Sequence, residues 1–258
     1  LDFYLDFTEY LKKSLNLATN TVGKQIAVLK MFLRVASDKG LNTNSDFKST
    51  RFKIITEDSE AIYLNNDELT QLYNLDLSQN NRLEKIRDLF LVSAYTGCRF
   101  SDVTNITKEN VKGSMIEIEQ IKTGKKVSIP FHPIVKTIWE KYGGELPRNV
   151  SNQKFNDYIK EVCKLAGINE PTTKSITKGG VRVTLRFEKW EMVTSHTARR
   201  SFATNLYKSG FPSISIMAIT GHKTETSFLK YIKVTPDEHA KLLELHWLKE
   251  GSYLRIAK

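Results

Sequence analysis

The sequence predicts a mainly α-helical chain with a small β-sheet, an α+β fold in two domains. Apolar residues recur at helical spacing through most of its 258 residues. Two stretches, at residues 114–130 and 174–194, show the alternation that is typical of strand pairs. Residues 41–59 lack sustained periodicity and are rich in Asn, Ser, Thr and charge, so we expect a basic interdomain linker over residues 46–60.

The first domain is expected over residues 1–45 as a small helical unit. Residues 3–15 form a crowded apolar pattern, and a clearer helix begins at Asn20 or Thr21 and stops at Gly40. Basic side chains follow its polar face and the linker, at Lys24, Lys30, Arg34, Lys48, Arg51 and Lys53. A solvated face and contact with DNA are both open for these six residues, and DNA contact is the functional hypothesis.

The second domain is expected over residues 61–258. Helices are predicted from residue 65, over 82–95 up to Gly97, and then over 132–142, 152–166, 195–208, 212–219 and 236–250. The first strand pair turns at Lys122–Lys125. In the second pair, Gly179 and Gly180 are expected to precede a strand over 181–187 that returns through Trp190 to Val193.

Composition favours a polyanionic partner. The 39 Lys and Arg against 29 Asp and Glu give a net charge of +10 and a pI near 9.4. No apolar run approaches the roughly 18 residues of a spanning helix, so we expect no membrane partner. Cys98 and Cys163 are the only cysteines and lack metal-binding spacing, which favours a reducing, cytoplasmic location.

A polar cluster lies toward the C-terminus. His196 and Arg199 are three residues apart, so one helix face would present an imidazole and a guanidinium together to an anion. His222 follows Gly221, and Tyr231 lies beyond it. A hydroxyl nucleophile, two imidazoles and an arginine are what phosphoryl transfer through a covalent tyrosine requires. No carboxylate cluster is evident in the sequence, so we expect no metal and no other cofactor.

These residues carry a resemblance to a known family. The ordered set Arg99, Lys122, His196, Arg199, His222 and Tyr231 resembles the tyrosine recombinase (phage integrase) family. The run from Thr96 to Asp102 is similar to the family's first arginine box, and the run from Thr194 to Thr204 to its second. The extra strand pair before the second box resembles integrases of Bacteroides-type mobile elements. The resemblance implies a core-site DNA-binding domain followed by a catalytic domain.

The chemistry assigns each residue an expected role. Arg99 and Arg199 would hold the nonbridging oxygens of a scissile phosphate, with Asp102 orienting Arg99. Tyr231 would attack phosphorus, and His196 would accept or position its proton. His222 would hydrogen-bond a phosphate oxygen, and Lys122 would protonate the leaving 5′ oxygen.

The implied partners are duplex DNA at core recombination sites and three further copies of the chain, as a tetramer on DNA in the bacterial nucleoid. The apolar run Leu242–Leu248 is the candidate for docking on a neighbouring protomer. Three questions stay open: whether accessory DNA-bending or excision factors take part, whether an N-terminal arm-binding domain was removed, and whether the reaction is integration, excision or chromosome-dimer resolution. So do two other functions, a type IB topoisomerase and a catalytically silent DNA-binding regulator.

Overall fold

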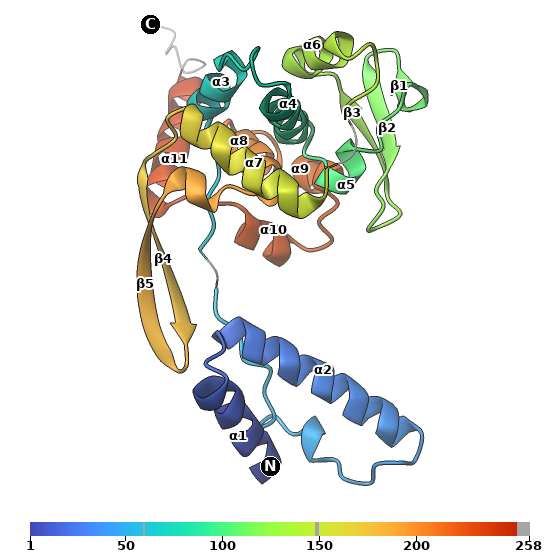
Figure 1. Ribbon diagram of the computed structural model, residues 1–258, viewed down its shortest axis with the longest axis vertical. Coiled ribbons are helices and arrows are strands. Elements are labelled where there is room, and N and C mark those ends of the chain that lie inside the picture. Colours follow the sequence, from blue (N-terminus) through green and yellow to red (C-terminus); the bar gives the residue numbers. More distant parts are fainter. Residues whose placement is uncertain (59, 148–149, 252–258) are drawn as a thin grey trace, which may run out of the picture. The chain divides into compact units, whose positions relative to one another are not determined.

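The computed structural model (Figure 1) describes residues 1–58, 60–147 and 150–251. The chain divides into two compact units. The first unit contains Leu1–Glu60 and Pro171–Phe187, and the second contains Ala61–Glu170 and the chain from Glu188 on. Ser59 of the expected linker and residues 252–258 of the expected second domain lie outside the described residues.

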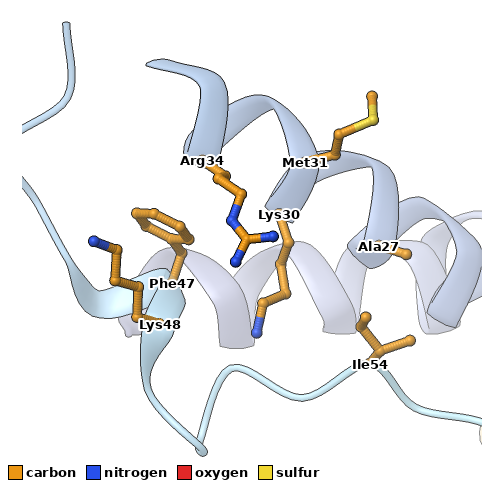
Figure 2. Close-up of a pocket in the computed structure, with 7 residues that line it drawn as sticks. All are labelled: Ala27, Lys30, Met31, Arg34, Phe47, Lys48 and Ile54. Carbon is orange, nitrogen blue, oxygen red and sulfur yellow. The ribbon is translucent and has the colours of Figure 1, made fainter. Parts of the chain in front are cut away.

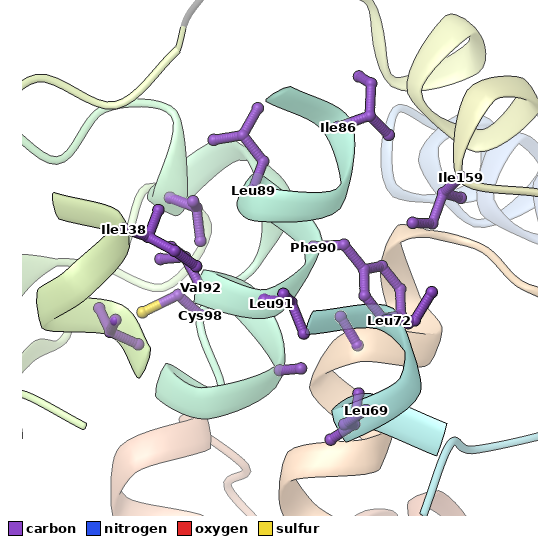
Figure 3. Packing of buried hydrophobic residues seen from close by; sticks show 14 of the residues in the cluster. Leu69, Leu72, Ile86, Leu89, Phe90, Leu91, Val92, Cys98, Ile138 and Ile159 are labelled. Carbon is purple, nitrogen blue, oxygen red and sulfur yellow. The ribbon is translucent and has the colours of Figure 1, made fainter. Parts of the chain in front are cut away.

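The second unit is built around α4, Asn81–Thr96. It is surrounded by α3 (Asn66–Asn74), α6 (Pro133–Lys141), α7 (Asn152–Leu165) and α8 (Ser195–Lys208) (Figure 1). Buried Leu89, Leu91 and Val92 of α4 belong to the same core cluster as Ile138 of α6 and Ile159 of α7 (Figure 3). Because α4 is covered on nearly every side, it forms the core on which the remaining elements are placed.

Most of the expected helices of this unit are confirmed. Asn65 caps α3 in a capping box with Glu68, and Gly97 ends α4 in the left-handed conformation. The remaining helices are α5 (Phe100–Val103), α9 (Ser213–Thr220), α10 (Glu225–Tyr231) and α11 (Pro236–Gly251). No separate pattern predicted α5 or α10, because each is too short to show helical periodicity.

A three-stranded antiparallel sheet confirms the first predicted strand pair. The strands β2 (Met115–Glu119) and β3 (Lys126–Pro130) pair with Ile116 opposite Ile129 and Ile118 opposite Val127. These four side chains are buried, so one face of the sheet packs on the core. The third strand, β1 (Val111–Lys112), was not predicted because two residues carry no alternation.

The first unit has its own small core. It is formed by helix α1 (Asp2–Glu9), a π-helical turn (Tyr10–Ser14) and helix α2 (Thr19–Asp38). Its buried residues include Tyr4 from α1, Leu11 from the turn, and Val22 and Ile26 from α2. Residues 46–60 were expected to form a linker, but part of this segment packs in the first unit, because Phe47 and Phe52 are buried in the same core. An aromatic pair spaced irregularly in a polar segment gives no periodic signal, although each ring removes a large apolar area from water.

Residues 55–57, near the end of the expected linker, lie against the N-terminal part of α2. Asn20 exchanges two 3.0 Å hydrogen bonds with the backbone of Glu57. A Cβ atom at Gly23 would lie 1.9 Å from the carbonyl oxygen of Ile55, so only glycine permits this approach. The contact fixes residues 55–57 on the first unit.

The second strand pair is a hairpin of β4 (Pro171–Lys178) and β5 (Val181–Glu188). The prediction that the pair begins after Gly179 and Gly180 was wrong, because these glycines, with φ of 60° and 85°, form the turn itself. Trp190 lies in a 3₁₀-helix instead of the returning strand.

The hairpin groups with the first unit, whereas the expected division placed it in the second domain. Its contacts explain the grouping, since Ala18 bridges Lys178 and the Thr177 amide donates to the Glu57 carboxylate at 3.2 Å. The mainly helical α+β class is confirmed. No helix within the described ranges is long and apolar enough to cross a membrane.

Candidate active site

Arg99 is positioned by the end of α4. A side chain at Gly97, where φ is +70°, would collide with the ring of Phe202, whose nearest atom lies 2.5 Å from the site of a Cβ. The glycine therefore reverses the chain tightly against α8 and makes Arg99 the N-cap residue of α5. Arg99 Nη1 donates a 3.1 Å hydrogen bond to Gln120 Oε1.

Helix α8 carries the predicted second box. Thr194 and Thr197 form a reciprocal cap at its start, and Ser195 hydrogen-bonds Asn152 and Asn156 of α7. Arg199 is only 3% exposed and donates from Nη1 to the carbonyl oxygen of Gly97 at 2.6 Å. Burial, and next the charge of Arg99, lower the pKa of Arg199, which nevertheless remains a cation at any physiological pH.

The two arginine boxes and the sheet turn meet at one cleft. Its volume is about 300 Å³. The lining residues are Arg99, Phe100, Ser101, Lys122, Asn152, Ser195, His196 and Arg199. Four of the six predicted catalytic residues are therefore brought together, although they are spread over 100 positions of the sequence.

Lys122 lies in the exposed turn between β2 and β3. The turn is closed by the backbone carbonyl of Gln120, which accepts from the amides of Thr123 at 3.2 Å and Gly124 at 2.8 Å. A flexible lysine on a short turn can reach an anion in the cleft.

His222 follows the left-handed Gly221 that ends α9. The Thr220 hydroxyl donates to the Ile216 carbonyl at 2.6 Å, so its oxygen is free to accept from His222 Nδ1, which lies 2.8 Å away. This arrangement favours the tautomer that leaves the Nε2 lone pair open. Burial, and then the charges of Arg199 and Arg99, lower the pKa of His222 to about 4, so the imidazole is neutral at pH 7.

Tyr231 ends α10 and lies beside two predicted site residues. Its hydroxyl donates to the His196 carbonyl at 3.3 Å, and its ring centroid is 5.0 Å from that of His222. The Arg200 guanidinium lies 5.1 Å from the Tyr231 ring centroid, within cation–π distance. Burial raises the pKa of Tyr231, while the charges of Arg199, Arg200 and Arg99 act in the opposite direction.

The His196 side chain is exposed on the cleft side of α8. Partial desolvation, and then the charges of Arg200, Arg199, Arg99 and Lys122, lower its pKa below the ordinary histidine value. A neutral imidazole at pH 7 can accept a proton. The cleft thus combines fixed positive charge, which suits a phosphate, with a neutral imidazole that can act as a base.

Asp102 is 3% exposed and belongs to α5. Its Oδ1 accepts from the amide of Ile121 at 3.1 Å, and its Oδ2 lies 3.8 Å from Arg99 Nη1. The carboxylate therefore attracts Arg99 without hydrogen-bonding it, and it anchors the start of the Lys122 turn.

Sequence reasoning missed three residues of this region. Gln120 contacts Arg99, Arg200 contacts Tyr231, and Asn152 lines the cleft. The available signals were that Gln120 lies two positions before Lys122 and that Arg200 directly follows Arg199. Neutral amides carry no chemical signature of their own in a sequence, so the contact of Gln120 with Arg99 and the place of Asn152 in the cleft are seen only in the structure.

The six basic residues predicted to bind DNA all belong to the first unit. Lys30, Arg34 and Lys48 line one hollow of about 610 Å³, where Lys30 and Arg34 extend from α2 toward the segment that carries Phe47 and Ile54 (Figure 2). Lys30 Nζ donates to the Phe52 carbonyl at 2.7 Å, so part of its hydrogen-bonding capacity is used within the unit. Lys24, Arg51 and Lys53 are exposed but do not line this hollow.

No three His, Cys, Asp or Glu side chains gather into a metal-binding group within the part of the chain that the structure describes. The two cysteines are both buried, and burial raises the pKa of the Cys98 thiol to about 11. Cys98 is therefore protonated beside the cleft and contributes packing.

The region that carries the site residues is similar to known proteins. The model of the phage integrase family matches residues 63–238. Tyrosine recombinase XerC of Rickettsia canadensis is 26% identical over 232 residues, covering 85% of this chain and 71% of that protein. The XerC protein of Staphylococcus saprophyticus is 22% identical and covers 93% of this chain and 80% of its own length.

Two solved structures share the fold. A lambda integrase dimer bound to a core site superimposes with a TM-score of 0.62 at 18% identity, covering 83% of this chain and 74% of that one. The Tn1549 transposon integrase in complex with circular-intermediate DNA gives 0.59 at 16% identity, covering 92% and 82%. The family match spans more than half of the chain and includes every predicted catalytic residue. The chain belongs to the phage integrase family and is a tyrosine-type site-specific recombinase.

Proposed function

We propose that this recombinase integrates or excises a mobile DNA element through a 3′-phosphotyrosine intermediate. The observation that carries the proposal is the cleft in which Arg99, Lys122, His196 and Arg199 meet, next to the Tyr231 hydroxyl. Three permanent cations and a neutral imidazole around one small cleft suit a phosphodiester. The Tyr231 phenol supplies the nucleophile that such a site needs.

Arg99 and Arg199 are proposed to hold the two nonbridging oxygens of the scissile phosphate. Charge increases on these oxygens as phosphorus becomes pentacoordinate, and preorganised guanidiniums stabilise that charge. Arg199 is the more rigid of the two, because it is buried and tied to the Gly97 carbonyl. Comparable donors contribute about 10²- to 10³-fold each to the rate.

Tyr231 is proposed to attack phosphorus, forming a phosphotyrosine bond as the bond to the 5′ oxygen breaks. The phenol proton passes to His196, which is neutral at pH 7, and the leaving oxygen takes a proton from Lys122. Strand transfer reverses these steps when another 5′ hydroxyl attacks the phosphotyrosine. The ester bond conserves the energy of the phosphodiester, so the reaction needs no nucleotide cofactor.

His222 is proposed to hydrogen-bond a nonbridging oxygen from Nε2. Because Nδ1 is engaged with Thr220, donation from Nε2 requires the protonated imidazole. The negative phosphate favours that form, so DNA binding should raise the pKa of His222 from its low value in the free protein.

The first unit is proposed to hold the core site by phosphate contacts from Lys24, Lys30, Arg34, Lys48, Arg51 and Lys53. Support comes from the convergence of Lys30, Arg34 and Lys48 on one hollow and from the net charge of +10. Phosphate contacts fix the position of the protein on the duplex, whereas recognition of a particular DNA sequence depends on base contacts and DNA shape.

Exchanging Arg34 and Lys48 for Gln should lower the salt dependence of DNA binding. Each lost phosphate contact reduces the slope of log K against log salt by about 0.9, so the double variant should lose about 2. Fluorescence anisotropy at several salt concentrations measures this slope. Lys112→Gln with Lys136→Gln removes the same charge from the second unit and serves as the control. An unchanged slope in Arg34→Gln/Lys48→Gln would contradict the proposed contacts.

The active assembly is proposed to be a tetramer on DNA, joined in part by α11. This helix exposes large apolar side chains, with Leu243 at 47%, Trp247 at 62% and Leu248 at 67% exposure. The side chain of Leu245, in the same apolar run, lies outside the described part. Burial of such a surface on a neighbouring protomer would remove it from water.

Replacing Leu243, Trp247 and Leu248 together by Gln should weaken tetramer assembly on DNA at least about tenfold. Sedimentation velocity with a four-way junction measures the assembly. The control is Lys241→Gln with Glu244→Gln, which changes exposed charged residues of the same helix without altering net charge. The variant is better than a truncation because it keeps the ion pair of Glu238 with Lys208 at the start of α11. Unchanged assembly would rule out this role for the helix.

Covalent trapping tests the whole proposal. The chain is recovered from cells under denaturing conditions, the attached DNA end is sequenced, and a nicked duplex with that end is made for assays in vitro. Attachment to the 3′ side supports the proposal. Relaxation of supercoiled plasmid without joining of two sites would indicate a type IB topoisomerase instead, and tight binding with no adduct would indicate a silent regulator.

A further inference from the structure

Gln120 is a buried amide at the centre of the proposed active site. It follows β2, is 1% exposed, and lies two positions before Lys122. Its Oε1 accepts from Arg99 Nη1 at 3.1 Å and from the Thr123 hydroxyl at 2.9 Å. Its Nε2 donates to the Ile219 carbonyl at 2.9 Å. One side chain thus joins three segments that are distant in sequence.

Each of these segments carries a proposed catalytic residue. Arg99 is contacted directly. Thr123 belongs to the turn of Lys122, whose backbone the Gln120 carbonyl also closes. Ile219 lies in the last turn of α9, which leads through Gly221 to His222.

The fit between Gly221 and Gln120 is tight. A Cβ atom on Gly221 would lie 2.3 Å from Gln120 Oε1, and the glycine has φ of +67°. The bare backbone at this position therefore gives the amide room to lie between the His222 turn and Arg99. The packing leaves little freedom for either partner to shift.

The chemistry of the amide suits this place. Its contacts require an acceptor toward Arg99 and a donor toward the Ile219 carbonyl, which glutamine provides in one orientation. A carboxylate would supply no donor, and its negative charge would offset the charge of Arg99. Asp102, the nearby anion, lies 3.8 Å from Arg99, beyond hydrogen-bonding distance. The direct hydrogen-bond acceptor is therefore neutral and does not itself offset the positive charge that Arg99 offers to a phosphate.

We propose that Gln120 is a positioning residue that holds Arg99 toward the scissile phosphate and keeps the Lys122 and His222 turns in register with it. The inference rests on the proposed phosphotyrosine chemistry. Gln120 acts on the phosphate through other residues, and its side chain links the sheet turn to the α9–α10 connection.

Gln120→Met keeps the length of the side chain and removes its hydrogen bonds. Single-turnover cleavage of the nicked duplex should slow about 10- to 100-fold, less than for loss of a direct donor, with DNA affinity within about twofold of wild type. A methylphosphonate at the scissile position lacks one anionic oxygen and depends less on Arg99, so the defect should shrink on that substrate. Gln71→Met, an exposed glutamine of the same unit, is the control.

Gln120→Glu supplies a readout that does not depend on the Met variant folding. A protonated carboxyl imitates the amide, with a carbonyl toward Arg99 and a hydroxyl toward Ile219, whereas the ionised form cannot. The cleavage rate relative to wild type should therefore rise as pH falls from about 8 to about 6.

Three outcomes would overturn the positioning role: wild-type cleavage by Gln120→Met, an equal defect on both substrates, or a Gln120→Glu to wild-type ratio that does not change with pH. Absence of an adduct from the wild-type chain itself would refute the proposed function instead, so the two failures are distinguishable.

Discussion

Tyr231→Phe is expected to form no covalent complex with the nicked duplex, while binding it with an affinity within about twofold of wild type. The phenol oxygen is the only atom removed, and no other group is proposed to attack phosphorus. Denaturing gel electrophoresis of labelled duplex after single turnover measures the complex. Loss of signal should be complete because a missing nucleophile removes the step instead of slowing it.

Tyr207→Phe provides the matched control, since Tyr207 lies in α8 of the same unit and its ring packs on Phe228. The control should retain wild-type cleavage. The Tyr231 hydroxyl donates a long hydrogen bond, 3.3 Å to the His196 carbonyl, and the loss of so weak a contact should leave the melting temperature nearly unchanged. A covalent complex formed by Tyr231→Phe would mean that another residue is the nucleophile.

Arg199→Lys is expected to slow cleavage about 10²- to 10³-fold. Lysine keeps the positive charge but loses the planar pair of donors, so it cannot hold the Gly97 carbonyl and a phosphate oxygen at once. The rate of covalent complex formation at saturating protein measures the effect. Since the charge is retained, DNA affinity should change far less than the rate.

Loss of the buried Arg199 contact should also cost stability, on the order of 1 to 3 kcal/mol, because the Gly97 carbonyl loses its donor. Thermal unfolding of the free protein separates this cost from the catalytic defect. Arg82→Lys is the control, an exposed arginine of the second unit that pairs with Glu161 at 3.3 Å. A cleavage rate within tenfold of wild type for a folded Arg199→Lys would contradict its proposed role.

Local pattern was sufficient for most of the helices. Caps and terminators such as Asn65 and Gly97 act through their own backbone and side chain, so their effect is visible in a short stretch of sequence. The strand order around Gly179 and Gly180 could not be read this way. Glycines can precede a strand or form its turn, and the choice depends on whether residues 171–178 find a partner.

The two-unit division shows the same limit. Phe47 and Phe52 lie in a polar stretch, and only their burial against Tyr4 and Ile26 makes them core residues. The β4–β5 hairpin likewise groups with the first unit through contacts with residues far away in sequence, including Ala18 and Glu57. Local periodicity carries no information about such pairings.

The sequence by itself determined the fold class, the family and the set of proposed catalytic residues. Charged and nucleophilic side chains can be recognised by residue type and spacing alone, because each type brings its own chemistry. Only the tertiary structure decided how they meet. It placed Arg199 on the Gly97 carbonyl, Tyr231 beside His196 and Arg200, and the neutral amide of Gln120 between Arg99 and the turn before His222. The physical reason is that a buried polar group is defined by the partners that satisfy it, and those partners come from segments far apart in the chain.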